Sequence, residues 1–327
     1  MDLPTLVTSL ITSGFVVGVG VPWLVKRGLD HGFSLNLATH KSELDAELTR
    51  LKGSLDAEGT IARANLESAL RQTTERILGE ESAERSYRFE AKKRLYHAVG
   101  PLRFQLVGAS VQFLSRLIGV TEHKFALNMQ RYFGRSFLYR VSRLLALTEL
   151  IERQTVYADF SVDDGMINLL RFRSQIMRAL SSDDVVVNHP NADWTRQKEH
   201  IFRDQLPVLG NCLVIEEEAG SRVMRFEEFD ECLEDESYLE PLKEILSTLH
   251  PTSTPILWMR LVAIAQACHQ LTHADDIAIA LDPEPFDLER LVDASEDSHM
   301  QQHRDELIGV LRSFADRITS PSTPAVA

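Results

Sequence analysis

The sequence between residues 44 and 77 repeats in eleven-residue units: LDAELTRLKGS (44–54), LDAEGTIARAN (55–65) and LESALRQTTER (66–76), followed by Ile77. Eleven residues complete three helical turns at about 3.67 residues per turn, so apolar side chains at this spacing form a nearly straight stripe. We therefore predict one long helix over residues 31–87. The stripe consists of Phe33, Leu44, Leu55, Leu66 and Ile77, with further lanes at Leu37, Leu48, Gly59 and Leu70 and at Leu51, Ala62 and Thr73.

This helix needs a surface that covers its stripe, because Gly53, Gly59 and Gly79 each cost about 1 kcal/mol relative to alanine. Three coverings fit the pattern: a second copy of the chain in a coiled-coil-like stalk, the surface of a lipid bilayer, or the downstream part of the chain. Helices that bind lipid surfaces are usually rich in Lys and Arg, whereas residues 41–85 carry at least as many acidic as basic side chains. The charges favour the stalk, and with it a homo-oligomer.

Residues 1–30 have the pattern of a single transmembrane anchor. Residues 3–25 contain no charged side chain, and at about 1.5 Å per residue they span roughly 35 Å, enough for a bilayer core. The positive-inside rule places the two cations that follow in the cytoplasm, which predicts a single-pass protein of the inner cell membrane with its N-terminus outside and its bulk inside. A small-xxx-small pair suits close helix packing in the membrane; the alternative is that these glycines are simply tolerated, because glycine is commoner in membrane helices than in soluble ones. The topology residues are Lys26 and Arg27, and the packing residues are Gly14 and Gly18.

Residues 88–318 are predicted to form a helical cytosolic domain and residues 319–327 a disordered tail rich in Ser, Pro and Thr. The expected fold class is therefore mainly α, with a helix break at Gly100 and Pro101 because proline interrupts a helix. Apolar spacing predicts helices over 88–119, 131–157, 163–180, 238–249, 255–271 and 296–318, and a further one that starts at Trp194. The helix over 131–157 should bury Phe137, Leu138, Val141, Leu144, Leu145, Thr148 and Ile151. Short strands are expected only at 185–187, 223–226 and 277–281, enough for one hairpin.

The net charge of −13 hides a basic middle. Residues 1–87 hold 9 basic and 12 acidic side chains, residues 88–178 hold 15 and 7, and residues 179–327 hold 11 and 29. In the middle zone, arginines alternate with aromatic residues, a composition that suits contact with phosphates and bases. We favour the alternative that the aromatic side chains are core and the arginines pair with the acidic last third, so nucleic acid is not an expected partner. The residues concerned are Arg131, Arg135, Arg140 and Arg143, with Tyr132, Phe133, Phe137 and Tyr139.

Two groups of histidines are the strongest candidates for metal chemistry. On a helix, histidines four residues apart share a face and can hold one metal ion, and a Glu-x-x-His pair occurs in carboxylate-bridged helix bundles. The second half of such a bundle is missing from the sequence, so no cofactor is expected. The candidate ligands are His269 and His273 in one group and Glu296, His299 and His303 in the other.

No phosphate loop, dinucleotide fingerprint, nucleophile elbow or HExxH motif occurs in the chain. The three cysteines, Cys212, Cys232 and Cys268, are scattered without CxxC spacing, as is typical of a reducing compartment. The sequence therefore predicts a membrane-anchored, cytosol-facing interaction protein that oligomerises through its stalk and binds another protein with its helical body. The alternative is a membrane-tethered effector or enzyme that uses the histidines and acids of the last third.

Overall fold

The computed structural model describes residues 37–123, 127–218, 220–235, 237–273 and 285–319. The chain divides into two compact units, residues 1–83 and residues 84–327. The predicted anchor, with Gly14, Gly18, Lys26 and Arg27, lies outside the described residues, as do Phe33 and the side chain of Leu44. Within the described part, no helix is both long enough and apolar enough to cross a bilayer.

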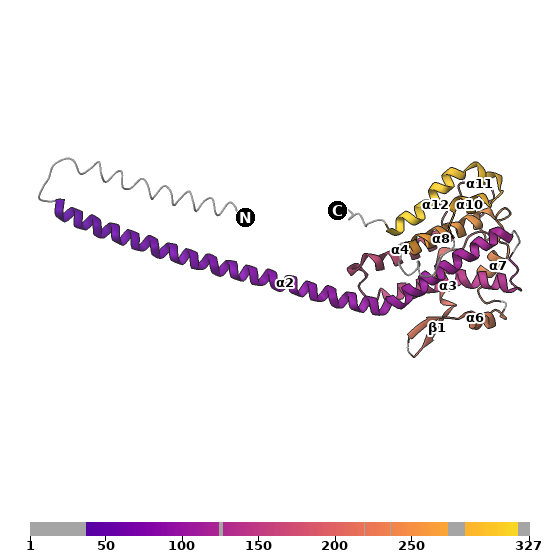
Figure 1. Cartoon of the computed structure of the whole chain (residues 1–327), viewed down its shortest axis with the longest axis horizontal. Helices are drawn as coiled ribbons and strands as arrows, with labels where there is room; N and C mark the ends of the chain where they lie inside the picture. The colour runs from indigo at the N-terminus through magenta and orange to yellow at the C-terminus, as the bar shows by residue number, and fades with distance from the viewer. Residues whose placement is uncertain (1–36, 124–126, 219, 236, 274–284, 320–327) are drawn as a thin grey trace. The chain divides into compact units, whose positions relative to one another are not determined.

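A mainly α fold is confirmed (Figure 1). The longer helices of the described residues are α2 (Leu37–His123), α3 (Tyr132–Gln154), α4 (Asp164–Ser181), α8 (Pro255–His273) and α12 (Arg304–Thr319). The shorter ones are α5 (Leu206–Asn211), α6 (Phe226–Cys232), α7 (Leu242–Ser247), α10 (Leu288–Asp293) and α11 (Ser298–Gln302), with 3-10 turns at Phe160–Val162 and Arg203–Gln205. Strands β1 (Val214–Glu217) and β2 (Gly220–Val223) form one antiparallel hairpin, in which Val214 pairs with Val223.

Helix α2 continues through Pro101, so the break predicted at Gly100 and Pro101 is wrong. Proline inside a helix costs about 3 kcal/mol, because it removes one hydrogen bond and crowds the preceding turn. Burial on both sides of the proline offsets this cost, since Leu95, Val99 and Leu106 are fully buried.

Helices α3 and α4 confirm the predictions made from apolar spacing. All seven residues predicted for the buried face of α3 are buried, and Phe137 packs against Phe113 of α2 with the ring centroids 6.1 Å apart. Helix α4 is capped by Asp163, whose side chain accepts a hydrogen bond from the N–H of Met166 at 3.2 Å. The cap stops the first turn from fraying and so defines where α4 begins.

Helix α8 is buried on nearly all sides and packs against α4, α10 and α12 (Figure 1). Trp258 is fully buried, and its indole N–H donates to the carbonyl of Leu291 at 2.8 Å, in α10. The buried indole thus keeps a hydrogen-bond partner, as such groups require. The second unit is therefore organised around α8. This helix begins at the predicted residue 255 and ends two residues after the predicted residue 271.

Several local predictions in the second unit are wrong. No helix starts at Trp194, because the Asp193 side chain accepts hydrogen bonds from the N–H and the hydroxyl of Thr195 and holds a turn there. Residues 185–187 form turns, not a strand, and Val187 has a positive φ of 47°. The strand predicted over 223–226 ends at Val223, and the helix predicted over 296–318 is divided at His303. Residues 277–281 lie outside the described residues.

Candidate functional site

The apolar stripe of α2 is exposed where the structure describes it. Leu55, Leu66 and Ile77 have 53%, 57% and 46% of their surfaces exposed. Leu51 and Leu70 of the neighbouring lanes are exposed to a similar extent. A row of half-exposed leucines on one face is typical of a surface that binds another apolar surface.

The first histidine group lies at the end of α8. The ring of His269 stacks on that of Phe286 with the centroids 4.6 Å apart, and the His273 ring lies 4.2 Å away on its own helix. Burial lowers the pKa of His269, and His273 lowers it further, so the imidazole favours its neutral form. The adjacent Cys268 is fully buried, and burial raises the pKa of its thiol to about 12, which makes it a poor nucleophile.

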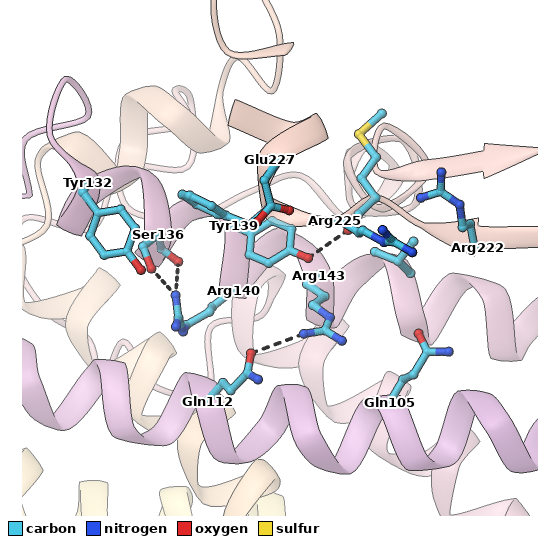
Figure 2. Close-up of a pocket in the computed structure, with 13 residues that line it drawn as sticks. Gln105, Gln112, Tyr132, Ser136, Tyr139, Arg140, Arg143, Arg222, Arg225 and Glu227 are labelled. Carbon is cyan, nitrogen blue, oxygen red and sulfur yellow. Dashed lines mark hydrogen bonds between the residues drawn. The ribbon is translucent and has the colours of Figure 1, made fainter. Parts of the chain in front are cut away.

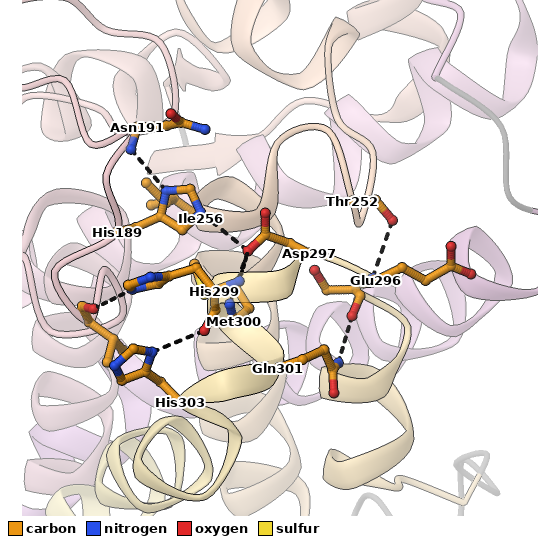
Figure 3. Close-up of polar contacts among 12 residues, drawn as sticks. His189, Asn191, Thr252, Ile256, Glu296, Asp297, His299, Met300, Gln301 and His303 are labelled. Carbon is orange, nitrogen blue, oxygen red and sulfur yellow. Dashed lines mark hydrogen bonds and ion pairs between the residues drawn. The ribbon is translucent and has the colours of Figure 1, made fainter.

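In the second histidine group, one ring nitrogen of His299 and one of His303 form a hydrogen bond to the backbone (Figure 3). His299 Nε2 lies 2.8 Å from the carbonyl oxygen of Val187, and His303 Nδ1 lies 3.0 Å from the carbonyl oxygen of His299. Since a carbonyl only accepts, His299 Nε2 and His303 Nδ1 carry the proton, and only the other nitrogen of each neutral ring keeps a lone pair for a metal. Among the described residues, no three His, Cys, Asp or Glu side chains form a group that can hold a metal ion. A metal at Glu296, His299 and His303 therefore stays a prediction without support from the geometry.

The partner of these histidines that sequence reasoning missed is His189 (Figure 3). His189 is buried, its Nδ1 accepts from the N–H of Asn191 at 3.1 Å, and its Nε2 donates to Asp297 at 3.2 Å. Asp297 also caps α11 through the N–H groups of His299 and Met300. The network therefore fastens the loop around residue 189 to α11, a segment far away along the chain.

We expect Asp297→Ala to lower the free energy of unfolding by about 1–2 kcal/mol, because α11 loses its cap and His189 its acceptor. Partial burial raises the pKa of Asp297, but the hydrogen bonds from Met300, His189 and His299 outweigh it and lower the pKa below its usual range. A lowered carboxyl pKa adds stability above the unfolded-state value, about 4, and this stability is lost as the pH falls through the folded value. Denaturation at pH 7 and pH 3 should show the difference between wild type and variant shrinking at pH 3; an unchanged difference would contradict this role.

An open groove of about 570 Å³ lies on the basic middle of the chain (Figure 2). Helix α2 contributes Gln105 and Gln112, and the segment from β2 into α6 forms the opposite wall. The α3 wall contains Tyr132, Ser136, Tyr139, Arg140 and Arg143, and the opposite wall contains Arg222, Val223, Met224, Arg225, Phe226 and Glu227. Apart from Glu227, the charged side chains that line the groove are arginines.

The alternating arginines and aromatic residues of α3 separate into two roles. Phe137 is core, and Tyr139 is buried with its hydroxyl donating to the carbonyl of Met224 at 2.8 Å. Arg135 pairs with Asp230 of the acidic last third at 2.8 Å, in agreement with the interpretation favoured from the sequence. Arg140 and Arg143 instead face the groove, which the sequence did not predict. The separation depends on which elements pack against α3, so its helical period alone did not reveal it.

Comparison with models of protein families, with curated proteins and with solved structures finds no match to this chain. Function is therefore inferred from the geometry of the stripe and of the groove.

Proposed function

We propose that the chain is an interaction protein that self-associates through the apolar stripe of α2 and presents its helical body to a partner protein. The observation that carries the proposal is the exposure of Leu55, Leu66 and Ile77 on one face of the helix. Fully burying a leucine or isoleucine side chain contributes about 1.5–3 kcal/mol. A second copy of the same helix provides a matching apolar stripe, so pairing would bury these side chains on both chains.

Charges beside the stripe favour a parallel arrangement. At about 98° per residue, the third position after each stripe residue lies about 65° to one side, and the eighth lies about 65° to the other side. Glu47 and Glu58 occupy the first flank, and Lys52 and Arg63 occupy the second. In parallel helices opposite flanks face each other, whereas in antiparallel helices like flanks meet. Acid therefore meets base only in the parallel pairing.

A membrane anchor is part of the proposal. It rests on the uncharged run of residues 3–25 and on Lys26 and Arg27 after it, which would keep the body in the cytoplasm. Parallel stalks agree with this topology, because all anchors then enter the same membrane from the same side. The anchor and the stalk are predicted from different residues, and the two predictions are compatible.

The stripe is tested with the full-length chain extracted in detergent. We expect Leu55→Asn with Leu66→Asn to weaken self-association at least about 100-fold, because both apolar contacts are lost in every copy and about 1.4 kcal/mol equals a tenfold change. The matched control is Ile61→Asn, which removes a residue that is 60% exposed on the same helix but off the stripe. Sedimentation velocity over a range of concentrations measures both.

Orientation is tested by oxidative cross-linking. Leu66→Cys should form a disulfide between copies in a parallel pair, because equivalent stripe positions then lie side by side, whereas Ile61→Cys should not exceed the wild-type background. A chain that stays oligomeric after both stripe substitutions would refute the stripe as the contact. Self-association without a cross-link at position 66 would refute the parallel arrangement alone.

A further inference from the structure

The groove between α2, α3 and the β2–α6 segment has the size of a small-molecule site. Its volume of about 570 Å³ falls within the range of roughly 300–1,000 Å³ that is common for ligand sites. The side chains of Gln105, Gln112 and Ser136 offer polar groups, and Tyr132 offers an exposed ring. Figure 2 shows Arg140 and Arg143 on the same side of α3, about one turn apart. The groove therefore combines volume, polar groups and positive charge.

The arginines on the α3 wall lack the acids that neutralise arginines elsewhere on this surface. Arg222 is paired with Glu217 and Glu228 at 2.5 and 2.7 Å. Arg143 donates instead to the neutral side chain of Gln112 at 3.2 Å, and Arg140 donates to the carbonyl of Ser136 at 3.0 Å. Among the side chains that the structure describes, neither of these two arginines forms an ion pair with a carboxylate.

Arg140 is the most constrained of these groups. Its Nε is buried and has no hydrogen-bond partner among the described residues. Burial lowers the pKa of its guanidinium, and the neighbouring Arg116 lowers it further. Arg116 is held in place by its hydrogen bond to the Ser136 hydroxyl at 3.1 Å and lies over the ring of Phe133 at 4.6 Å. Like charges held together at a half-buried site are unfavourable, and a bound anion relieves the repulsion.

We propose that this groove binds a phosphate-bearing small molecule of about the size of a mononucleotide, with its phosphate on Arg140 and Arg143. Guanidinium groups suit phosphate because their N–H donors match two oxygens at once. The ring of Tyr132 packs edge-on against that of Phe226 with the centroids 5.6 Å apart, and it is 64% exposed. It provides a surface on which a base or another ring of the ligand stacks. Glu227, the acid in the groove, opposes the phosphate charge and sets a limit on affinity.

The test uses the full-length chain in detergent, with ATP, inorganic pyrophosphate and a water-soluble short-chain phosphatidylglycerol as separate probes. We expect ATP and pyrophosphate to bind in calorimetry, and Arg140→Gln with Arg143→Gln to weaken binding at least about 30-fold, because each lost charge-assisted hydrogen bond weakens binding roughly tenfold. The matched control is Arg131→Gln, an exposed arginine at the start of the same helix that does not line the groove. It should leave the affinity within about twofold.

An additional variant and the lipid probe distinguish loss of the site from loss of folding and from binding to a lipid headgroup. Glu227→Gln should strengthen ATP binding by a few fold, which loss of folding cannot mimic. Binding of the short-chain phosphatidylglycerol that is lost in the double variant, without ATP binding, would assign the same phosphate chemistry to a lipid headgroup and overturn the small-molecule proposal. Absence of binding to all three probes, or binding that is unchanged in the double variant, would overturn it as well. Sedimentation of the same samples reports self-association through the stripe separately from ligand binding. The arginine substitutions should leave self-association unchanged, because they lie outside residues 1–83.

Discussion

Replacing Arg260 by leucine is expected to lower the free energy of unfolding by about 3–5 kcal/mol. Arg260 is 1% exposed and donates to three backbone carbonyls: Glu199 at 2.8 Å, Ala179 at 2.8 Å and Ser182 at 2.7 Å. Burial lowers the pKa of its guanidinium to about 10, so it stays charged at neutral pH. Leucine leaves three carbonyls without donors, and it leaves the buried carboxylate of Glu199 without a nearby cation.

Chemical denaturation followed by tryptophan fluorescence measures this loss, since Trp258 is fully buried in the same helix. The control is Arg312→Leu, whose side chain is 60% exposed and pairs with Glu289 at 3.3 Å. It should cost less than about 1 kcal/mol, because exposed ion pairs contribute little. The loss in free energy of unfolding for Arg260→Lys should lie between those of Arg260→Leu and Arg312→Leu, since one ammonium group does not replace the planar set of guanidinium donors. A cost for Arg260→Leu as small as that of the control would show that the buried network is dispensable.

The second large effect is expected at Gly134, in the first turn of α3. A Cβ atom at this position would lie 2.3 Å from the carbonyl oxygen of Asn128 and 2.6 Å from its carbonyl carbon. Both are backbone atoms, and they are held in place because the Asn128 carbonyl accepts from the N–H of Arg131 at 3.0 Å. We expect Gly134→Ala to cost about 2–3 kcal/mol, because the turn before α3 must move. Tyr132 moves with it, so binding of ATP in the groove should weaken as well.

A glycine-to-alanine change at Gly309 of α12 gives the matched control. Gly309 is exposed, and no atom lies within 4 Å of the place that the new methyl group would occupy. Alanine should therefore stabilise the chain by about 0.5–1 kcal/mol through helix propensity and reduced freedom of the unfolded state. Thermal unfolding of the two variants should shift the midpoint in opposite directions. Equal shifts would mean that the close approach at Gly134 has no energetic consequence.

Three of the long helices were predicted well from the sequence, whereas the continuity of α2 through Pro101 and most of the short elements were not. Helices α3, α4 and α8 begin and end within a few residues of their predicted limits. The apolar spacing of α3 and α4 is a local signal, because a helix that buries one face needs apolar residues every three to four positions. The helix predicted at Trp194 failed for an equally local reason, the turn held by Asp193. The four-residue strands of the hairpin are too short to show a clear alternation.

In the candidate sites, too, features of a single helix could be predicted from the sequence, and features that depend on packing between helices could not. The alignment of Leu55 and Leu66 on one face could be predicted, because it follows from the repeat of a single helix, whereas their exposure is seen only in the structure. The roles of Arg135 and Arg140 could not, although they lie close together on one helix. Arg135 meets Asp230, whereas Arg140 faces an open groove, and only the packing of α6 and β2 beside α3 makes that difference. The two arginines therefore differ in the elements that pack beside them and not in their spacing along α3.

The sequence alone predicts that the chain is mainly helical, the approximate limits of α3, α4 and α8, and the buried face of α3. Tertiary structure alone decided which buried polar groups find partners. Glu199 lies in a loop, yet its carboxylate accepts from the N–H groups of Ile256 and Leu257 and so caps α8 from 57 and 58 residues away. Periodicity depends on neighbours along one helix, whereas such a cap depends on two distant segments meeting. A buried charge is tolerated only where that meeting supplies its hydrogen bonds.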